Sequence, residues 1–256
     1  MRVKRVTADP RFTAAMAAID RDHDRLVSDI VTLTEIPAPP FKEERRAAAF
    51  LDLLLGAGLA DVERDPEGNV MGLRRGTGAA GGPLVAVVAH LDTVFPEGTD
   101  VRVKRQGTRL TAPGVGDNTR SLAVMLAMIR AMNEARITTA SDLLFVGNVG
   151  EEGLGDLRGV KYLLKQGRYK DRIAQFLAYG HDVVARACGG ILEAACVHFV
   201  GRGADNVPVT HADHVRLAAV PRQRRDAGLD AGGAPAARRG DLCRQDEPSR
   251  VRAHGL

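Results

Sequence analysis

The residues best suited to chemistry near the middle of the chain are His90 and Asp92, at the end of the segment PLVAVVAHLDTV. One residue separates them, so in an extended chain both side chains leave on the same face. An imidazole there can bind a metal through one ring nitrogen, while a nearby carboxylate accepts the other N–H and fixes the tautomer. An isolated H-x-D motif also fits a histidine that only hydrogen-bonds its neighbour. The motif therefore needs support from elsewhere in the chain.

Two further segments supply carboxylates. Asp117 lies in GVGDNTRS, where Gly114 and Gly116 allow close approach of the backbone, and Glu151 and Glu152 follow the apolar segment SDLLFVGNVG. One imidazole and several carboxylates suit a hydrolytic zinc or a pair of divalent ions. Adjacent glutamates fit one metal ligand and one general base. Taken singly, the aspartate also fits a helix N-cap and the glutamates a solvated turn, but the three segments together favour a metal-dependent site.

These residues need elements that bring strand ends together. The short apolar runs 85–89, 143–146 and 176–178 predict neighbouring buried strands whose carboxyl ends converge. Amphipathic helices are predicted at 23–36 and 43–55, and a strongly apolar helix at 121–134. Alternating strands and helices predict an α/β fold, a mostly parallel sheet flanked by helices. In such sheets, ligands and catalytic groups collect at the carboxyl ends of the strands.

Short strands are predicted at the periphery as well. The segment ADVERDPEGNVMGLRRG predicts two strands around a DPEGN turn. The polar alternating segment VRVKRQGTRLTAPG predicts a strand pair at the edge of the sheet.

The segments AHLDTV, GVGDNTRSLA and GNVGEEGLGDLRG, in this order and spacing, resemble the di-zinc metallopeptidases related to tripeptide aminopeptidase, aminoacylase, succinyl-diaminopimelate desuccinylase and carboxypeptidase G. The resemblance covers about the first 180 residues. It implies a zinc exopeptidase-like catalytic domain that binds two Zn²⁺ ions, with Co²⁺ or Mn²⁺ as alternatives. It further implies hydrolysis of a peptide or N-acyl amino-acid amide bond.

The same resemblance implies a role for each residue of the motifs. His90 would be a terminal zinc ligand, oriented by the Asp92 carboxylate. Asp117 would bridge the two ions and precede a cis peptide bond. Glu151 would be the general base that takes a proton from the attacking water, and Glu152 would bind the second zinc.

The resemblance ends after the strand AQFLAY. The family places an acidic ligand there, whereas this chain has Gly180, so His181 and Asp182 remain as candidates for that ligand. Neither the inserted lid domain nor the last histidine ligand can be matched. We therefore expect a chain truncated or frameshifted after about residue 180, with weak metal binding and peptidase activity near background. A non-catalytic remnant or binding protein that retains the fold is the alternative.

This expectation divides the chain at 10–182, the catalytic part, and 183–256, a tail rich in Arg, Ala and Gly that we expect to be disordered. The tail offers four further metal-ligand types: Cys188, Cys196, His198 and His211. No C-x-x-C pair occurs among them, so a second metal site is not expected. The arginines lack interleaved aromatic residues, so a nucleic-acid partner is not expected either.

Composition fits a globular protein: 256 residues, 45% hydrophobic, 27% charged, with a formal net charge of +4. No apolar stretch is long enough to span a bilayer, and no apolar segment of a signal peptide follows the basic amino terminus. We therefore expect a cytoplasmic protein with no membrane partner, acting on a small peptide or N-acyl amino acid. The family resemblance implies a homodimer whose usual interface lies on the unmatched lid.

Overall fold

The computed structural model describes residues 6–180, 196–199 and 214–216. A six-stranded sheet in the order β1-β2-β6-β3-β7-β8 forms its centre. Its strands are β1 (Ala60–Arg64), β2 (Val70–Arg74), β6 (Asp142–Asn148), β3 (Leu84–His90), β7 (Ile173–Gly180) and β8 (Cys196–Phe199). Most of the predicted tail lies outside the described residues.

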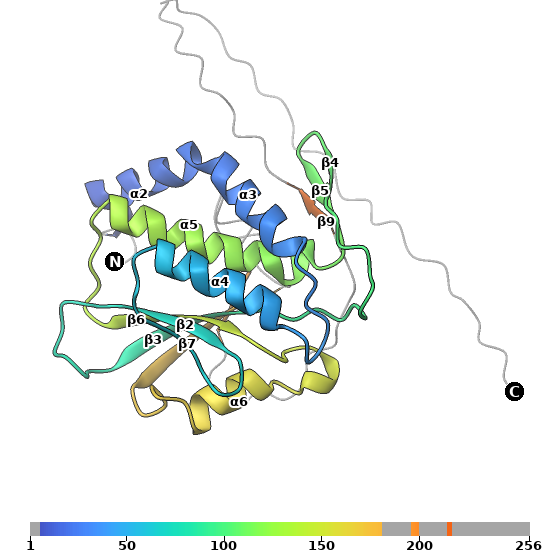
Figure 1. Cartoon of the computed structure of the whole chain (residues 1–256). Helices are drawn as coiled ribbons and strands as arrows, with labels where there is room; N and C mark the ends of the chain where they lie inside the picture. Colours follow the sequence, from blue (N-terminus) through green and yellow to red (C-terminus); the bar gives the residue numbers. More distant parts are fainter. Residues whose placement is uncertain (1–5, 181–195, 200–213, 217–256) are drawn as a thin grey trace, which may run out of the picture. The chain divides into compact units, whose positions relative to one another are not determined.

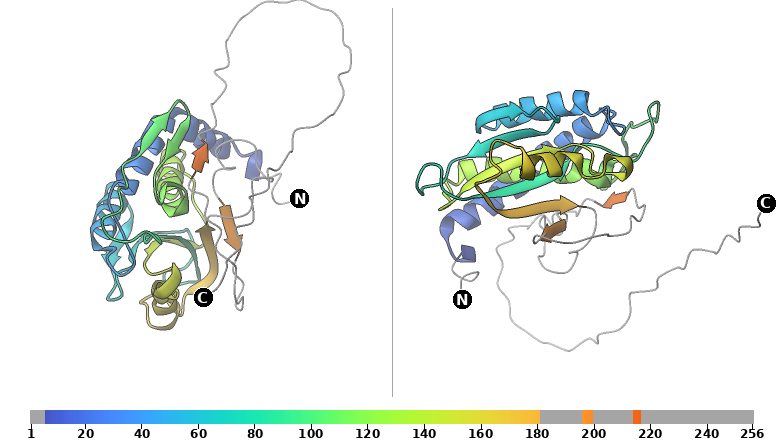
Figure 2. Two further views of the ribbon diagram at one scale, coloured as in Figure 1. Left: turned by 90° about the vertical axis from the view of Figure 1, so that its right-hand side faces the viewer. Right: turned by 90° about the horizontal axis from the view of Figure 1, so that it is seen from below.

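Helices cover both faces of this sheet (Figures 1 and 2). One face carries α3 (His23–Thr34), α4 (Glu44–Gly56) and α5 (Arg120–Glu134), with α2 (Pro10–Arg21) packed on α5. The other face carries α6 (Arg158–Lys165). In this part of the chain, no helix is both long and apolar enough to cross a membrane. The predicted α/β class, with helices flanking the sheet, is confirmed, but the sheet is mixed rather than mostly parallel, because only two of its five described strand pairings are parallel.

The centre of the sheet is parallel, and its margins are antiparallel. Strand β3 pairs in parallel with β6 on one side and β7 on the other, through registers such as His90↔Asn148 and Val88↔Ala178. Strands β1, β2 and β8 pair antiparallel to their neighbours. The prediction of three neighbouring strands with converging carboxyl ends is confirmed.

The apolar run of β3 is buried on both faces, as its β-branched composition predicts. Val87 and Ala89 pack under α4 and α5, whereas Ala86 and Val88 face α6. Gly147 of β6 is required here because a Cβ on it would lie 2.8 Å from the ring of Phe50 in α4. Helix α4 therefore packs closely against β6 just before the end of that strand.

The predicted strand pair after Pro96 forms, but its placement at the edge of the main sheet is wrong. Strands β4 (Lys104–Gln106) and β5 (Arg109–Thr111) belong to a separate three-stranded sheet with β9 (His214–Arg216). All three residues of β4 are exposed, so this strand offers no apolar face with which to extend the central sheet.

Candidate metal centre

Three side chains from three separate segments meet at the carboxyl edge of the central strands. One nitrogen of His90 and one carboxylate oxygen each of Asp117 and Glu152 all lie within 4.8 Å of one another. Ligands at about 2.1 Å from a shared ion lie at most about 4 Å apart, so small side-chain rotations bring these atoms into range. One imidazole and two carboxylates are donor types that divalent zinc accepts.

His90 is the last residue of β3, and its ring is held in one orientation. The ring is 5% exposed, and Nδ1 lies 3.0 Å from the backbone oxygen of Asp92. A carbonyl oxygen only accepts, so Nδ1 carries the hydrogen. The other nitrogen, Nε2, faces Asp117 Oδ1 at 2.9 Å and Glu151 Oε2 at 3.9 Å. The strand end therefore presents Nε2 to the carboxylates as the nitrogen that can bind a metal.

Asp92 anchors the glutamate pair. Its side chain is fully buried, and its two oxygens accept the backbone N–H groups of Glu151 at 3.0 Å and Glu152 at 2.9 Å. Oδ1 is also 3.6 Å from His90 Nδ1. The carboxylate thus ties the end of β3 to the loop after β6, with its closest contacts on the glutamate backbone. This second function was not predicted from the sequence.

Asp117 projects from an irregular turn, Val115–Thr119, whose backbone leaves the helical region at Asp117 and Asn118. The Asp117–Asn118 peptide bond is cis, which confirms the expectation from the resemblance. The amide of Asn118 donates to the backbone oxygen of Tyr179 at 2.7 Å, tying the turn to β7. The N-cap of α5 is Thr119, so the alternative that Asp117 caps this helix is wrong.

The two glutamates differ in exposure. Glu152 is 5% exposed, whereas the side chain of Glu151 is 41% exposed. Burial raises the pKa of Glu152 to about 7, and the carboxylates of Asp117, Glu151 and Asp92 contribute to the rise while His90 opposes it. Because Glu152 is buried, it does not fit the alternative of a solvated turn. The buried glutamate fits a metal ligand, and the exposed one can reach water.

The cluster holds an excess of negative charge around one imidazole. Burial alone would lower the pKa of His90, but hydrogen bonds to Asp117 and Asp92 outweigh it and raise the pKa well above the ordinary value. The site therefore favours a cation at this point, either a proton or a metal ion. The donor set fits a divalent metal.

Arg46 of α4 binds the backbone next to His90 and Asp92, and the sequence did not predict this contact. It is fully buried and donates to the backbone oxygen of Leu91 at 2.7 Å and to that of Ile36 at 2.7 Å. Leu91 lies between His90 and Asp92, so this guanidinium fixes the turn that carries both. Burial lowers the pKa of Arg46 to about 10, opposed by the charge of Asp92.

The structure does not describe the side chains of the remaining candidates. His181 and Asp182 follow the end of β7 but are not described, and neither are the side chains of Cys188, Cys196, His198 and His211. The structure therefore leaves the predicted third ligand of each zinc untested.

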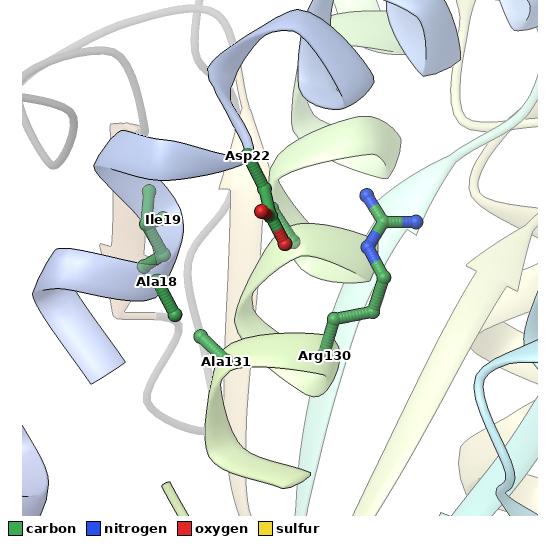
Figure 3. A pocket seen from close by; sticks show the side chains of 6 residues that line it. Ala18, Ile19, Asp22, Arg130 and Ala131 are labelled. Carbon is green, nitrogen blue, oxygen red and sulfur yellow. The ribbon is translucent and has the colours of Figure 1, made fainter. Parts of the chain in front are cut away.

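A small hollow lies away from the strand ends, between α2 and α5 (Figure 3). Six residues line it: Ala18, Ile19, Asp22, Ala127, Arg130 and Ala131. Its volume of about 10 Å³ is close to the minimum for one water molecule, so it offers no room for a substrate.

Comparison with solved structures identifies the same fold in several peptidases. Aminopeptidase PepT from Bacillus cereus ATCC 10987 matches with a TM-score of 0.52 and 22% identity, covering 62% of this chain and 44% of that one. The di-peptidase Dug1p from Saccharomyces cerevisiae matches with a TM-score of 0.53 and 15% identity over 66% and 40% of the two chains. Human carnosine dipeptidase 1 gives 0.54 and 15% over 66% and 41%. This chain thus spans less than half the length of each.

Two sequence comparisons bear on the family, one with curated proteins and one with family patterns. No curated protein sequence matches the chain. The pattern of the family described as peptidase family M20/M25/M40 matches residues 86–217. That segment is more than half of the chain and includes His90, Asp117 and both glutamates. The chain belongs to peptidase family M20/M25/M40.

Proposed function

We propose that this chain carries the catalytic centre of a metal-dependent hydrolase that cleaves peptide or N-acyl amino-acid amide bonds, of the exopeptidase or deacylase type. The observation that carries the proposal is the convergence of His90, Asp117 and Glu152 beside the half-exposed Glu151. The matching aminopeptidase and dipeptidases support small peptides as the substrate class. The division of the chain into a catalytic part, residues 10–182, and a tail, residues 183–256, remains part of this proposal.

We assign the ligands as follows. Nε2 of His90 and one oxygen of Asp117 would hold one Zn²⁺, and Glu152 with the other oxygen of Asp117 would hold a second. His181 or Asp182 remains the candidate for a further ligand. Divalent ions bound there would polarise the amide carbonyl and lower the pKa of water. Co²⁺ and Mn²⁺ suit the same oxygen and nitrogen donors as substitutes.

Side chains of the chain itself would carry out the proton transfer and hold the site in position. Glu151 lies 3.9 Å from His90 Nε2 and reaches solvent, so it is placed to take the proton of the attacking water. The same carboxyl group then delivers that proton to the leaving amine nitrogen. Asp92 holds the backbone of both glutamates, which keeps the base and the neighbouring ligand in fixed relation.

A second candidate is a non-catalytic relative that keeps the fold and a weakened site. Gly180 favours it, because the family resemblance places an acidic ligand at this position. Loss of a protein ligand should weaken metal binding by more than the 10–100-fold typical of lost outer partners. We therefore expect low turnover from these 256 residues.

The test is to strip the purified chain of metal, reload it with Zn²⁺, Co²⁺ or Mn²⁺, and assay di- and tripeptides and N-acyl amino acids. Glu151→Gln should abolish any turnover while leaving metal binding intact, because the base contacts water rather than the ion. Glu97→Gln is the control, since Glu97 is 72% exposed and pairs with Lys42 on the surface. Metal binding without turnover on any substrate would favour the non-catalytic relative. Turnover that survives Glu151→Gln would refute the assignment of the base.

A further inference from the structure

Arg158, the first residue of α6, joins two acidic residues from distant segments. Its Nη2 lies 2.8 Å from each carboxylate oxygen of Glu43, at the start of α4. Its Nη1 lies 2.8 Å from Glu67 Oε1 and 3.0 Å from the Glu67 backbone oxygen, in the turn between β1 and β2. We call Arg158, Glu43 and Glu67 the arginine clamp.

The arginine clamp is better fixed than a surface ion pair. The side chain of Glu43 is 3% exposed and that of Arg158 is 22% exposed, so water screens the pair poorly. One nitrogen of the guanidinium, Nη2, contacts both oxygens of Glu43, and the other, Nη1, binds Glu67, so the group joins two carboxylates by charge-assisted hydrogen bonds. The ring of Phe41 lies 5.3 Å from the guanidinium carbon, and the Phe41 N–H donates to Glu43 Oε1 at 3.2 Å. The guanidinium is therefore held on several sides.

The stem of Arg158 lies directly on the backbone that leads to the glutamate pair. A Cβ added to Gly150 would lie 2.5 Å from both Cγ and Nε of Arg158, so no larger residue fits between them. Gly150 immediately precedes Glu151. Asp92 accepts the backbone N–H groups of Glu151 and Glu152 in the same loop. The loop is thus fixed at two adjacent points, by the Asp92 carboxylate at Glu151 and Glu152 and by the stem of Arg158 at Gly150.

We propose that Arg158 is a positioning residue for the metal centre. Through Glu43 and Glu67 it fixes Gly150, and through Gly150 it fixes the direction in which the buried Glu152 carboxylate faces His90 and Asp117. Its charge is matched by two carboxylates, so its role is to hold this loop in place rather than to attract an anionic substrate. The inference rests on the proposed function, because it assumes that Glu152 binds a metal.

The test compares Arg158→Met with Arg168→Met in the full chain. Methionine keeps an unbranched stem of similar length against Gly150 and removes the fork that holds both carboxylates. Arg168 is the matched control, because it pairs with Glu63 at 3.1 Å on the surface and its side chain is 56% exposed. Metal affinity is measured by calorimetry with Zn²⁺, and ligand geometry is read from the visible absorption spectrum of bound Co²⁺.

Arg158→Met should raise the dissociation constant for Zn²⁺ by about 10–100-fold, the usual effect of losing an outer partner of a ligand, and should alter the Co²⁺ spectrum. Arg168→Met should change neither. Arg158→Lys should give an intermediate affinity, because an ammonium group cannot bind Glu43 and Glu67 in the same forked geometry. A purely structural role would lower the unfolding midpoint of Arg158→Met while its Zn²⁺ affinity and Co²⁺ spectrum stayed unchanged, and that result would overturn the proposal.

Arg158→Met leaves Glu43 buried without its partner, so the variant can fail to fold. The double variant Arg158→Met/Glu43→Gln removes both charges and keeps the volume, and it decides the question in that case. It should show the same loss of Zn²⁺ affinity, and wild-type affinity in it would overturn the proposal. A wild-type chain that binds no divalent metal would instead refute the proposed function itself.

Discussion

Replacing Asp92 by asparagine should lower both the stability of the fold and the affinity for metal, because Asp92 holds the loop that carries Glu151 and Glu152. The carboxylate of Asp92 accepts N–H groups from Glu151 and Glu152 at 3.0 and 2.9 Å in a fully buried position. Asparagine keeps the volume but supplies only one acceptor oxygen. Its amide NH₂ group must then face one of the two backbone N–H donors.

The size of the effect follows from these contacts. A hydrogen bond to a charged group contributes about 1.5–3 kcal/mol, and a buried donor left unpaired costs about 1–3 kcal/mol. Removing one carboxylate from the crowded cluster around Glu152 offsets part of the loss, since Asp92 is among the groups that raise the Glu152 pKa. We expect the free energy of unfolding of metal-free Asp92→Asn to fall by roughly 2 kcal/mol.

Metal binding should suffer as well, because the loop that carries Glu152 loses one of its fixed points. We expect the Zn²⁺ dissociation constant to rise about 10–100-fold. Urea unfolding in the presence of chelator measures the first effect, and calorimetric titration of Zn²⁺ measures the second. Asp100→Asn is the control, since Asp100 is 56% exposed and pairs with Arg102 in solvent, and it should leave both quantities unchanged. Wild-type Zn²⁺ affinity in a destabilised Asp92→Asn would refute a link between this carboxylate and the metal ligands.

Two further predictions concern the support of the site and of the sheet. Arg46→Met should lower the free energy of unfolding by about 2–4 kcal/mol in urea titrations, because the carbonyl oxygens of Leu91 and Ile36 lose their buried donor; an unchanged midpoint would refute this. The Gly76 N–H and the Arg172 guanidinium hold the pKa of Asp142 below its ordinary 3.8, so the Asp142 carboxylate stabilises the fold above about pH 4 and this contribution is lost as pH falls through the lowered value. Asp142→Asn should therefore cost about 1–2 kcal/mol at pH 7 and less at acid pH, and an equal cost at both pH values would contradict the assignment.

The strand ends could be predicted from the sequence because two local signals coincide there. The apolar, β-branched run before His90 predicts a strand buried on both faces, and the polar residues after it must then lie at the end of that strand. The same reasoning placed the glutamates after β6. Parallel pairing of β3 and β6 then brings the two ends together without any further information.

The supporting residues were not predictable in the same way. Arg46 lies on an amphipathic helix, where an arginine ordinarily predicts a solvent-facing position, yet it is fully buried because three carbonyl groups converge on it. Arg158 and Glu43 are 115 residues apart, and no local pattern links them. Strand β4 was misplaced because a polar alternation predicts a strand but not the sheet to which it belongs.

The most direct test of the central claim is titration of the metal-stripped chain with Zn²⁺, comparing the wild type with Asp117→Ala. Asp117 lies 2.9 Å from His90 Nε2 and shares the cluster with Glu152, so we assign one of its oxygens to each ion. The wild type should bind Zn²⁺, and Asp117→Ala should lose binding of both ions while retaining the fold. Equal Zn²⁺ binding by the two proteins would contradict the metal centre proposed for this chain.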